Sequence, residues 1–239
     1  MNTTKKPINM NVKLSEQDIK KYNWYIWRFF IGCFAFVVIM IGLTALGAFG
    51  PLPSFRDLEN PKSDQASQII SSDKQVLGKW YVTANRSSVP FNKISPYVIN
   101  ALIAKEDNNF YTHSGIDFKR TFTILLYLMV GKKQGASTIT QQLALNLFSD
   151  HTRAHNPLKR IIQKMQELII AIRIEKHYTK QEIVTMYLNT VDFGNNASGI
   201  SSAATTYFNT TPDKLTPDQA ALLIQLLRGP SYYSPIRHP

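Results

Sequence analysis

Two glutamates in different surroundings are the residues of this chain best suited to chemistry. Glu106 ends an apolar stretch and is followed by Asp107, whereas Glu167 stands three residues after Lys164. Two carboxylates in unlike settings are the usual equipment for reactions at the anomeric carbon of a sugar. Glu106 is therefore a candidate general base. Without further context, a surface or capping carboxylate is the simpler interpretation of Glu106.

Three charged residues are spaced to share one stripe of a predicted helix. Arg160, Lys164 and Glu167 stand at i, i+4 and i+7, apart from the apolar positions of the same segment. The two cations could hold an anionic leaving group such as pyrophosphate. The alternative is a solvated helix face with ordinary pairing between residues one turn apart.

A polar run at a predicted helix start also allows two interpretations. Its members are Ser137, Thr138, Thr140, Gln141 and Gln142. The free N–H groups and the dipole of a helix N-terminus form an anion site, but an exposed polar helix start explains the same residues. His113 could be a catalytic group or a hydrogen-bonded structural histidine, and we favour the second.

The composition narrows the class of partner. The 239 residues carry a formal net charge of +11 and a single cysteine, Cys33. A basic surface attracts anionic partners such as lipid headgroups or a phosphorylated substrate. The sequence has no arginine-rich run or nucleic-acid motif, so we expect no nucleic acid. One cysteine excludes an internal disulfide and a multi-cysteine metal site, and zinc-ligand spacing is absent.

The N-terminal part predicts a membrane anchor. Residues 1–28 are polar and basic, and the run 29–49 contains no charge. Its length of about 21 residues matches the span of a bilayer core. The positive flank predicts a cytoplasmic N-terminus with the remainder exported. A cleaved signal peptide is the rival interpretation, but the run is long for one. A polar linker at 50–68 would lead into a domain at 69–239.

The exported part is predicted to be mainly α-helical. A small β-hairpin is expected over 69–82, before the helical domain. Capping signals begin helices at Ser95, Thr179 and Thr216. Helices are expected over 96–106, 118–130, 138–148 and 157–177. In the last of these, the apolar positions that repeat at three and four are Leu158, Ile161, Ile162, Met165, Leu168, Ile169 and Ile172.

The expected helix 118–130 is apolar almost all round and is too short to span a bilayer. It is either a buried core helix or a segment that dips into the membrane surface, with basic residues at the headgroups. The sequence leaves both interpretations open.

Five segments of the exported part resemble the motifs of one family, the glycosyltransferase domain of class A penicillin-binding proteins (glycosyltransferase family 51), of the penicillin-binding protein 1A type. The segments are 106–115 (EDNNFYTHSG), 135–142 (GASTITQQ), 163–167 (QKMQE), 183–189 (IVTMYLN, followed by Gly194) and 229–235 (GPSYYSP). Each alone is weak. The first two, in this order and behind a membrane anchor, are very specific.

The resemblance implies a lysozyme-like α-helical fold and the polymerisation of lipid II, a disaccharide-pentapeptide on undecaprenyl pyrophosphate, into β-1,4-linked glycan. Glu106 would take the proton from the acceptor's 4-hydroxyl, whose oxygen attacks the anomeric carbon of the growing chain with inversion. Lys164 would steady the departing pyrophosphate. Glu167 would position that pyrophosphate or a bound divalent cation, Mg or Mn.

The resemblance thus gives Glu106 and Glu167 catalytic roles. The residues that it assigns to substrate binding are Asp107, Phe110, His113, Gly115, Ser137, Thr138, Thr140, Gln141, Gln142, Arg160, Lys164 and Asn189. The implied partners are lipid II, the growing glycan chain, the membrane and other cell-wall synthesis proteins. The implied location is the cytoplasmic membrane, crossed once, with the catalytic domain on its outer, periplasmic side.

Two positions depart from the family pattern. Leu145 and Gln163 stand where the family usually has lysine and arginine. If that lysine binds phosphate, its loss removes a charge-assisted contact of roughly 1.5–3 kcal/mol, or about ten- to a hundredfold in rate. Arg160, one turn before Gln163, could substitute in part.

Three functions therefore compete. The first is an active peptidoglycan glycosyltransferase, which the intact Glu106 and Glu167 favour. The second is a non-catalytic member that binds lipid II or cell-wall assembly partners as a scaffold, which Leu145 and Gln163 favour. The third is a hydrolytic muramidase on a similar fold, which would need no pyrophosphate grip. Family members usually continue beyond the fifth segment, often into a transpeptidase domain, so we expect a truncated C-terminal end.

Overall fold

The computed structural model describes residues 15–54, 67–73, 76–80, 88–121, 123, 135, 137–148, 156–230 and 232–236. The chain divides into two compact units, Met1–Gly50 and Pro51–Pro239. The finer division expected from the sequence stays a prediction, and most of the expected linker lies outside the described residues.

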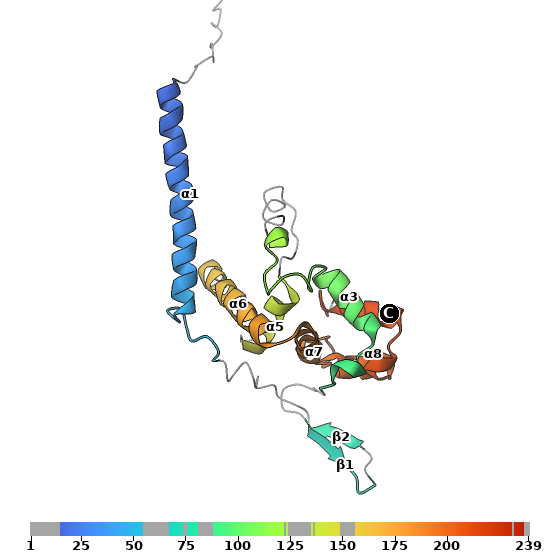
Figure 1. Ribbon diagram of the computed structural model, residues 1–239. Coiled ribbons are helices and arrows are strands. Elements are labelled where there is room, and N and C mark those ends of the chain that lie inside the picture. The colour runs from blue at the N-terminus through green and yellow to red at the C-terminus, as the bar shows by residue number, and fades with distance from the viewer. Residues whose placement is uncertain are drawn as a thin grey trace, which may run out of the picture. The chain divides into compact units, whose positions relative to one another are not determined.

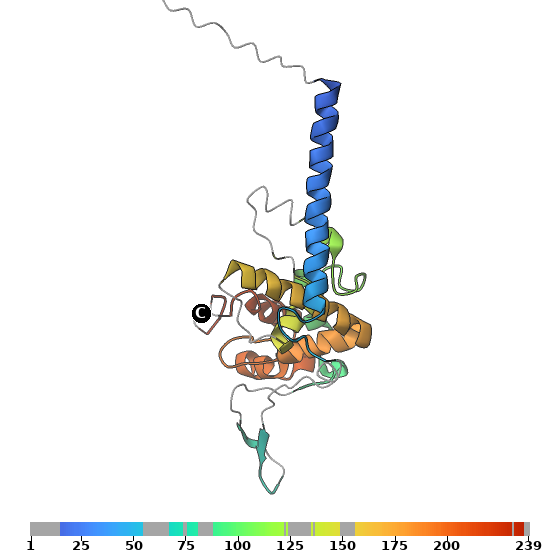
Figure 2. The same cartoon turned by 90° about the vertical axis from the view of Figure 1, so that its left-hand side faces the viewer.

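The first unit contains one long helix, α1, over Glu16–Ala45. It begins where the Ser15 side chain accepts a hydrogen bond from the backbone N–H of Gln17. In the described part of the chain, α1 is the one helix long and apolar enough to cross a membrane, by its length and composition. It runs without a break from the basic flank into the apolar stretch (Figures 1 and 2). Helical structure therefore extends across the expected cytoplasmic boundary at residue 28.

Before the helical domain, two short strands pair antiparallel. β1 covers Ser67–Ile70 and β2 covers Val76–Trp80. Ser67 lies opposite Trp80 and Ile70 lies opposite Val76, with an irregularity between Ile69 and Ile70.

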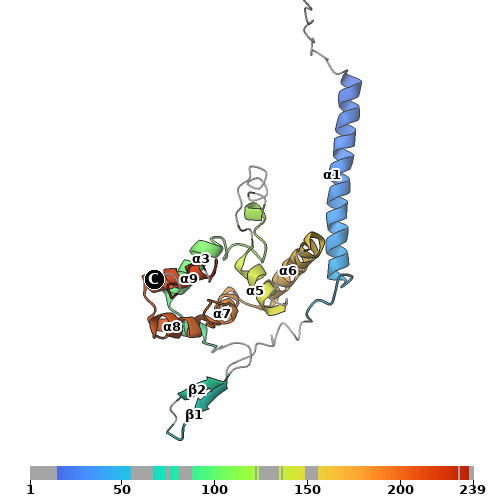
Figure 3. The same cartoon turned by 180° about the vertical axis from the view of Figure 1, so that it is seen from behind.

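The second unit is mainly α-helical, as expected. Its helices are η1 (Phe91–Lys93), α3 (Pro96–Glu106), α5 (Ile139–Phe148), α6 (Pro157–His177), α7 (Lys180–Thr190), α8 (Ile200–Phe208), η2 (Pro212–Lys214) and α9 (Pro217–Leu226). Helix α5 packs against both α6 and α7, and α3 packs against α9 (Figures 1 and 3). Fully buried side chains such as Leu102, Phe110, Leu143 and Tyr187 join these helices in one core. The end of α3 and the start of α5 thus meet over a common apolar base.

Local capping explains where several helices begin. Asn156 accepts from the N–H of Leu158 at the start of α6. Thr179 and Glu182 form a capping box at the start of α7, as the spacing predicts. Ser95 also precedes a helix as predicted, but its hydroxyl donates to the carbonyl of Leu215 over 2.9 Å instead of capping α3. The side chain of Ser95 therefore ties α3 to the segment before α9.

Helix α6 buries a different face from the one that its apolar repeat indicates. Leu158 and Ile161 are 71% and 51% exposed. The buried residues of the helix are Glu167, Ile170, Ala171 and Ile174. These lie on the continuation of the stripe that carries Lys164, because they follow it at intervals of three and four. The charged stripe therefore runs into the core, and Glu167 becomes nearly buried.

The expected helix over 118–130 is described only at its beginning. Residues 118–121 and 123 are helical. Asp117 accepts a hydrogen bond from the N–H of Arg120 over 2.9 Å, so it caps this helix. The remainder of the segment lies outside the described residues.

Candidate active site

Glu106 is the last residue of α3, and its carboxylate reaches α5. Its Oε2 accepts a hydrogen bond from Gln142 Nε2 over 2.9 Å. The other end of that amide, Gln142 Oε1, accepts from the hydroxyl of Tyr187 on α7, also over 2.9 Å. Glu106 is half-buried, whereas Tyr187 is fully buried. The Glu106 carboxylate is thus held at the edge of the core by Gln142, which is itself bonded to the buried Tyr187.

Asp107 has the opposite environment, since it is completely buried. Its Oδ2 accepts from the N–H of Ile139 over 3.1 Å, at the first turn of α5. His113 Nε2 lies 3.0 Å from the same oxygen, and the Arg120 guanidinium lies 3.8 Å from Oδ1. Arg120 also donates to the backbone carbonyl of Glu106. Asp107 therefore joins the end of α3 to the start of α5, and both of its carboxylate oxygens have partners.

The partners of His113 determine which of its nitrogens carries the proton. Its Nδ1 accepts a hydrogen bond from the N–H of Gly115 over 3.2 Å. A nitrogen that accepts carries no proton, so Nε2 is the nitrogen that donates to Asp107 in this arrangement. Both nitrogens are therefore occupied within the loop. This geometry supports the structural interpretation of His113.

Gly115 occupies a position that suits glycine for two reasons. Its φ is +90°, a conformation that residues with a side chain rarely adopt, and a Cβ would lie 3.1 Å from the backbone of Ala171 on α6. Its carbonyl accepts from Thr138 Oγ1 over 2.8 Å and from Gln141 Nε2 over 3.1 Å. Thr138 and Gln141 are buried. These side chains therefore hold the loop and α5 together.

A cationic group lies beside the start of α5. Lys164 Nζ donates to Ser137 Oγ and to Glu167 Oε2, each over 2.8 Å. The Lys164 side chain is 40% exposed, while that of Glu167 is 12% exposed. Glu167 thus anchors the lysine from the buried side and leaves its ammonium open to solvent. Ser137 lies two residues before α5, and Gln142 lies in the first turn of that helix, so Lys164 and Glu106 each contact the N-terminal part of the same segment.

A second ion pair lies behind these groups. Lys180 Nζ lies 2.8 Å from both oxygens of Glu175, donates to the carbonyl of His113 over 2.7 Å, and stands 4.3 Å from the ring centre of Phe110. Glu175 also accepts from Thr140 Oγ1 over 2.6 Å. Thr140 and Phe110 are buried. This cluster fastens α6, α5 and the loop after α3 to one another.

One protein family matches most of this chain. Residues 73–239 match the family Transglycosylase, which is more than half of the chain. The chain belongs to the transglycosylase family. The matched range contains all five segments that resemble the penicillin-binding proteins, and it contains every residue described above from Glu106 to Tyr187.

Several penicillin-binding proteins are relatives of this transglycosylase domain. Penicillin-binding protein 1F of Bacillus subtilis (strain 168) is 40% identical over 176 residues, which are 73% of this chain and 24% of that protein. Penicillin-binding protein 1A of Escherichia coli (strain K12) is 36% identical over 187 residues, which are 77% of this chain and 21% of that protein. Penicillin-binding protein 2a of Streptococcus pneumoniae (strain ATCC BAA-255 / R6) is 38% identical over 208 residues, which are 84% of this chain and 27% of that protein. The chain spans about a quarter of these relatives' length, and the resemblance to the glycosyltransferase domain of this class is confirmed.

Two of the expected substrate-binding residues of the transglycosylase domain have other surroundings. Both ends of the Asn189 amide pair with the backbone of Val89, the Nδ2 over 2.9 Å and the Oδ1 over 3.1 Å. The structure therefore uses Asn189 to attach the segment before η1 to α7. Arg160 is exposed, one turn before Lys164 on α6. The structure thus places Glu106, Lys164 and Glu167 around the segment Ser137–Gln142 at the start of α5, whereas the amide of Asn189 is bonded to Val89.

Four further side chains belong to this site, although no catalytic or substrate-binding role was expected for them. Tyr187 holds Gln142, Arg120 holds the end of α3, and the Lys180–Glu175 pair holds the loop. Tyr187 lies inside the segment IVTMYLN, so the motif itself was the available signal. Nothing in the spacing of Arg120 or of the Lys180–Glu175 pair indicates their partners, because those partners are distant in the sequence.

The pKa values of two titratable groups near the site, Tyr187 and Asp117, are shifted in opposite directions. Burial, and then the negative charge of Glu106, raise the pKa of Tyr187 far above its usual value, so its hydroxyl stays protonated. Burial opposes the charge of Asp117, but the hydrogen bonds from the N–H of Arg120 and the amide of Asn109 outweigh it and lower the pKa of Asp117. Asp117 therefore stays ionised and keeps its capping role.

A divalent cation would need several oxygen ligands at this site. Among the described residues there is no group of three or more His, Cys, Asp or Glu side chains that could hold a metal. Mg²⁺ is often held by one or two carboxylates together with substrate phosphates. Glu167 is the carboxylate in place, and it is already paired with Lys164. A cation here would need further oxygen ligands besides Glu167.

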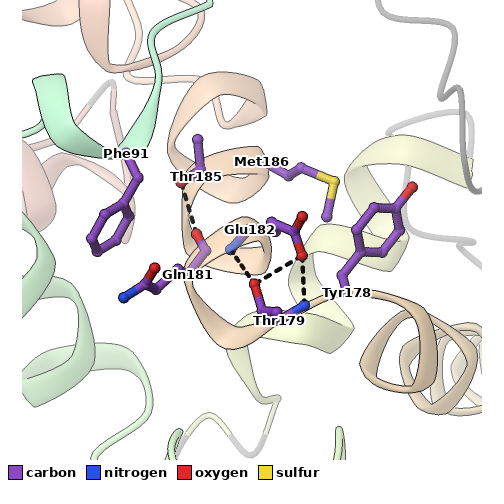
Figure 4. A pocket seen from close by; sticks show the side chains of 7 residues that line it. All are labelled: Phe91, Tyr178, Thr179, Gln181, Glu182, Thr185 and Met186. Atoms are coloured by element: carbon purple, nitrogen blue, oxygen red, sulfur yellow. Dashed lines mark hydrogen bonds between the residues drawn. The ribbon is translucent and has the colours of Figure 1, made fainter.

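Among the described residues of the domain, one hollow borders the site and another lies apart from it. The first is formed by Asn109, Thr112, His113, Ser114, Ile116, Asp117, Phe118 and Lys119, on the loop after α3. The second lies at the start of α7, between Phe91, Tyr178 and Met186 (Figure 4). Its carboxylate, Glu182, accepts from the N–H and the hydroxyl of Thr179, and these two bonds lower the pKa of Glu182. That carboxylate is used to cap the helix, and none of the expected site residues lines this hollow.

Proposed function

We propose that this chain is a peptidoglycan glycosyltransferase that polymerises lipid II into β-1,4-linked glycan strands and releases undecaprenyl pyrophosphate. The observation that carries the proposal is that a half-buried carboxylate, Glu106, and a partly exposed ammonium, Lys164, both contact the segment Ser137–Gln142 at the start of α5. A base and a cation so placed can face the two ends of a displacement reaction. Membership of the transglycosylase family supports the same chemistry.

In the proposed reaction, Glu106 accepts the proton of the acceptor's 4-hydroxyl. The oxygen attacks the anomeric carbon of the lipid-linked chain, and the bond from that carbon to the pyrophosphate breaks with inversion. Lys164 stabilises the negative charge that develops on the leaving pyrophosphate. Glu167 holds the ammonium of Lys164 in place. Mg or Mn, if bound, would share the pyrophosphate with Glu167, and the proposed steps do not depend on it.

We propose a membrane arrangement to match this substrate. Helix α1 would cross the cytoplasmic membrane once, because its apolar part has the required length. Lys20, Lys21 and Arg28 would keep the N-terminus in the cytoplasm. The Arg28 guanidinium, 3.8 Å over the ring of Trp24, would stand with that ring at the inner interface. The transglycosylase domain would then meet lipid II at the outer, periplasmic face.

The residue at position 145 favours a second candidate function, that of a lipid II-binding scaffold. Leu145 follows Gln142 at i+3 on α5 and is half-buried, where the family usually has lysine. A chain without that cation could bind lipid II and act as a scaffold for cell-wall synthesis proteins. The scaffold function predicts binding of lipid II without polymerisation.

The deciding experiment compares Glu106→Gln with the native chain in detergent, using labelled lipid II. Removing a general base typically costs 10²- to 10⁴-fold, so we expect polymerisation to fall at least a hundredfold while lipid II binding is retained. Glu16→Gln, at an exposed position in the first turn of α1, is the matched control and should keep full activity. Polymerisation by Glu106→Gln at the native rate would refute the assignment, and binding without polymerisation by the native chain would establish the scaffold function.

A further inference from the structure

A chain of hydrogen bonds runs from the core of the domain to Glu106. The Tyr187 hydroxyl donates to Gln142 Oε1, and Gln142 Nε2 donates to Glu106 Oε2, each over 2.9 Å. The three residues belong to α7, α5 and α3; α5 lies beside α7 (Figure 3), and the end of α3 reaches α5 through the hydrogen bond of Glu106. Tyr187 is completely buried, Gln142 is half-buried, and Glu106 is half-buried at the outer end. These hydrogen bonds therefore connect the buried Tyr187 to Glu106, the proposed base.

The middle member of this chain could in principle face either way. A glutamine amide donates from its nitrogen and accepts at its oxygen. It could serve an ionised carboxylate by donating, or a protonated one by turning over and accepting. For the buried Tyr187 hydroxyl, Gln142 Oε1 is the acceptor in the described part of the chain. Turning the amide over would leave that hydroxyl proton without an acceptor, and a buried donor without a partner is costly.

We propose that Tyr187 is a positioning residue for the proposed reaction: its hydroxyl holds the Gln142 amide so that the NH₂ group always faces Glu106. The inference rests on the proposed function of Glu106 as the general base. The hydrogen bond from Gln142 fixes the orientation of the Glu106 carboxylate. It also occupies Oε2 and leaves Oε1 to meet the acceptor hydroxyl. Tyr187 thus acts through Gln142 and does not touch the substrate.

The charged groups around Glu106 in the described residues do not replace this function. Lys105 and Asp107 flank it in the sequence, and Arg120 binds its backbone carbonyl instead of its carboxylate. Lys105 is bonded to Gln225 on α9. The hydrogen bond from Gln142 is the one that the Glu106 carboxylate receives from a described side chain.

The test is steady-state polymerisation of labelled lipid II by the full chain in detergent. Tyr187→Phe removes the hydroxyl and keeps the ring in the core. We expect kcat to fall about two- to tenfold, the rate equivalent of one ordinary hydrogen bond, while KM changes less than twofold. Gln142→Leu should lower kcat further. The double variant should be no slower than Gln142→Leu, because Tyr187 has no other route to Glu106.

Tyr207→Phe is the matched control. Its hydroxyl also donates a hydrogen bond, in this case to the backbone carbonyl of Phe193, and accepts one from Asn195, in a different part of the domain. It should leave kcat unchanged. A Tyr187→Phe variant with native kcat, or one that raises KM alone, overturns the inference. A double variant whose loss equals the product of the single losses does the same, since Tyr187 would then act independently of Gln142.

A second measurement separates failure of this inference from failure of the proposed function. In protein labelled with side-chain ¹⁵N-glutamine, the NMR signal of the Gln142 NH₂ group is identified by its absence in Gln142→Leu. It should shift in Tyr187→Phe and in Glu106→Gln, and stay in place in Tyr207→Phe. This readout needs no turnover. An unchanged signal in Tyr187→Phe overturns the inference even if the chain polymerises, and a native chain without activity refutes the function while the signal still tests the positioning.

Discussion

The buried pair of Lys180 and Glu175 offers a quantitative test of how the site is held together. Lys180 is 22% exposed at its side chain and Glu175 is 5% exposed. The ammonium also donates to the carbonyl of His113 and faces the ring of Phe110. Lys180→Met would leave the Glu175 carboxylate buried with the hydroxyl of Thr140 as its remaining donor in the described residues. An unpaired buried charge is expensive to keep in the folded state.

The magnitude follows from the burial of the two partners. Removing one member of a buried pair costs about 3–5 kcal/mol, and the partial exposure of Lys180 favours the lower end. For a domain of this size, about 1 kcal/mol shifts the melting temperature by about 2–4 °C. We therefore expect Lys180→Met to lower the melting temperature by about 6–12 °C, measured by thermal unfolding of the detergent-solubilised chain.

Two further variants make the explanation refutable. The double variant Lys180→Met/Glu175→Gln removes both charges and should recover at least half of the loss, because no charge is then stranded. Lys176→Met, at an exposed position near the end of α6, should change the melting temperature by less than about 2 °C. A stable Lys180→Met, or a double variant as unstable as the single one, would show that the pair does not stabilise the fold in this way.

Two other predictions concern the site and its loop. Leu145→Lys introduces a cation one turn beyond Gln142. We expect it to polymerise labelled lipid II about ten- to a hundredfold faster, because a charge-assisted contact contributes roughly 1.5–3 kcal/mol. An unchanged rate would mean that no phosphate approaches this position. The lowered pKa of Asp117 means that the carboxylate stabilises the fold above the ordinary carboxyl pKa and loses this contribution as the pH falls through the lower folded value. The melting temperature should therefore fall between about pH 5 and pH 3, and Asp117→Asn should start lower and fall less steeply, whereas an equal slope in both chains would exclude this contribution.

The helices themselves follow from local sequence. Asn156 before Pro157 and the Thr179–Glu182 box are capping signals that act within one turn, so the starts of α6 and α7 could be read directly. The apolar run in α1 likewise needs no tertiary context, because its composition and length decide that it can span a bilayer. The motif segments also identified the family, since residue type and order alone carry that information.

Tertiary structure decided which side chains act and which merely support. The apolar repeat of α6 indicated one buried face, but the domain packs the face that carries Glu167, because α5 offers partners for that side. His113 and Asn189 resemble site residues in sequence, yet their polar atoms are taken by Asp107, Gly115 and Val89. These partners lie on other elements or across the loop, where spacing along the chain cannot show them.

The same reason explains why Tyr187 emerged only from the fold. Its position in the sequence shows a tyrosine within a motif, and its function depends on two hydrogen bonds that cross from α7 to α5 and from α5 to α3. The sequence alone determined the helices, the membrane-spanning candidate, the family and the candidate carboxylates. The tertiary structure decided the burial of each group and its hydrogen-bond partner, because both depend on residues that are remote in the chain and adjacent only after folding.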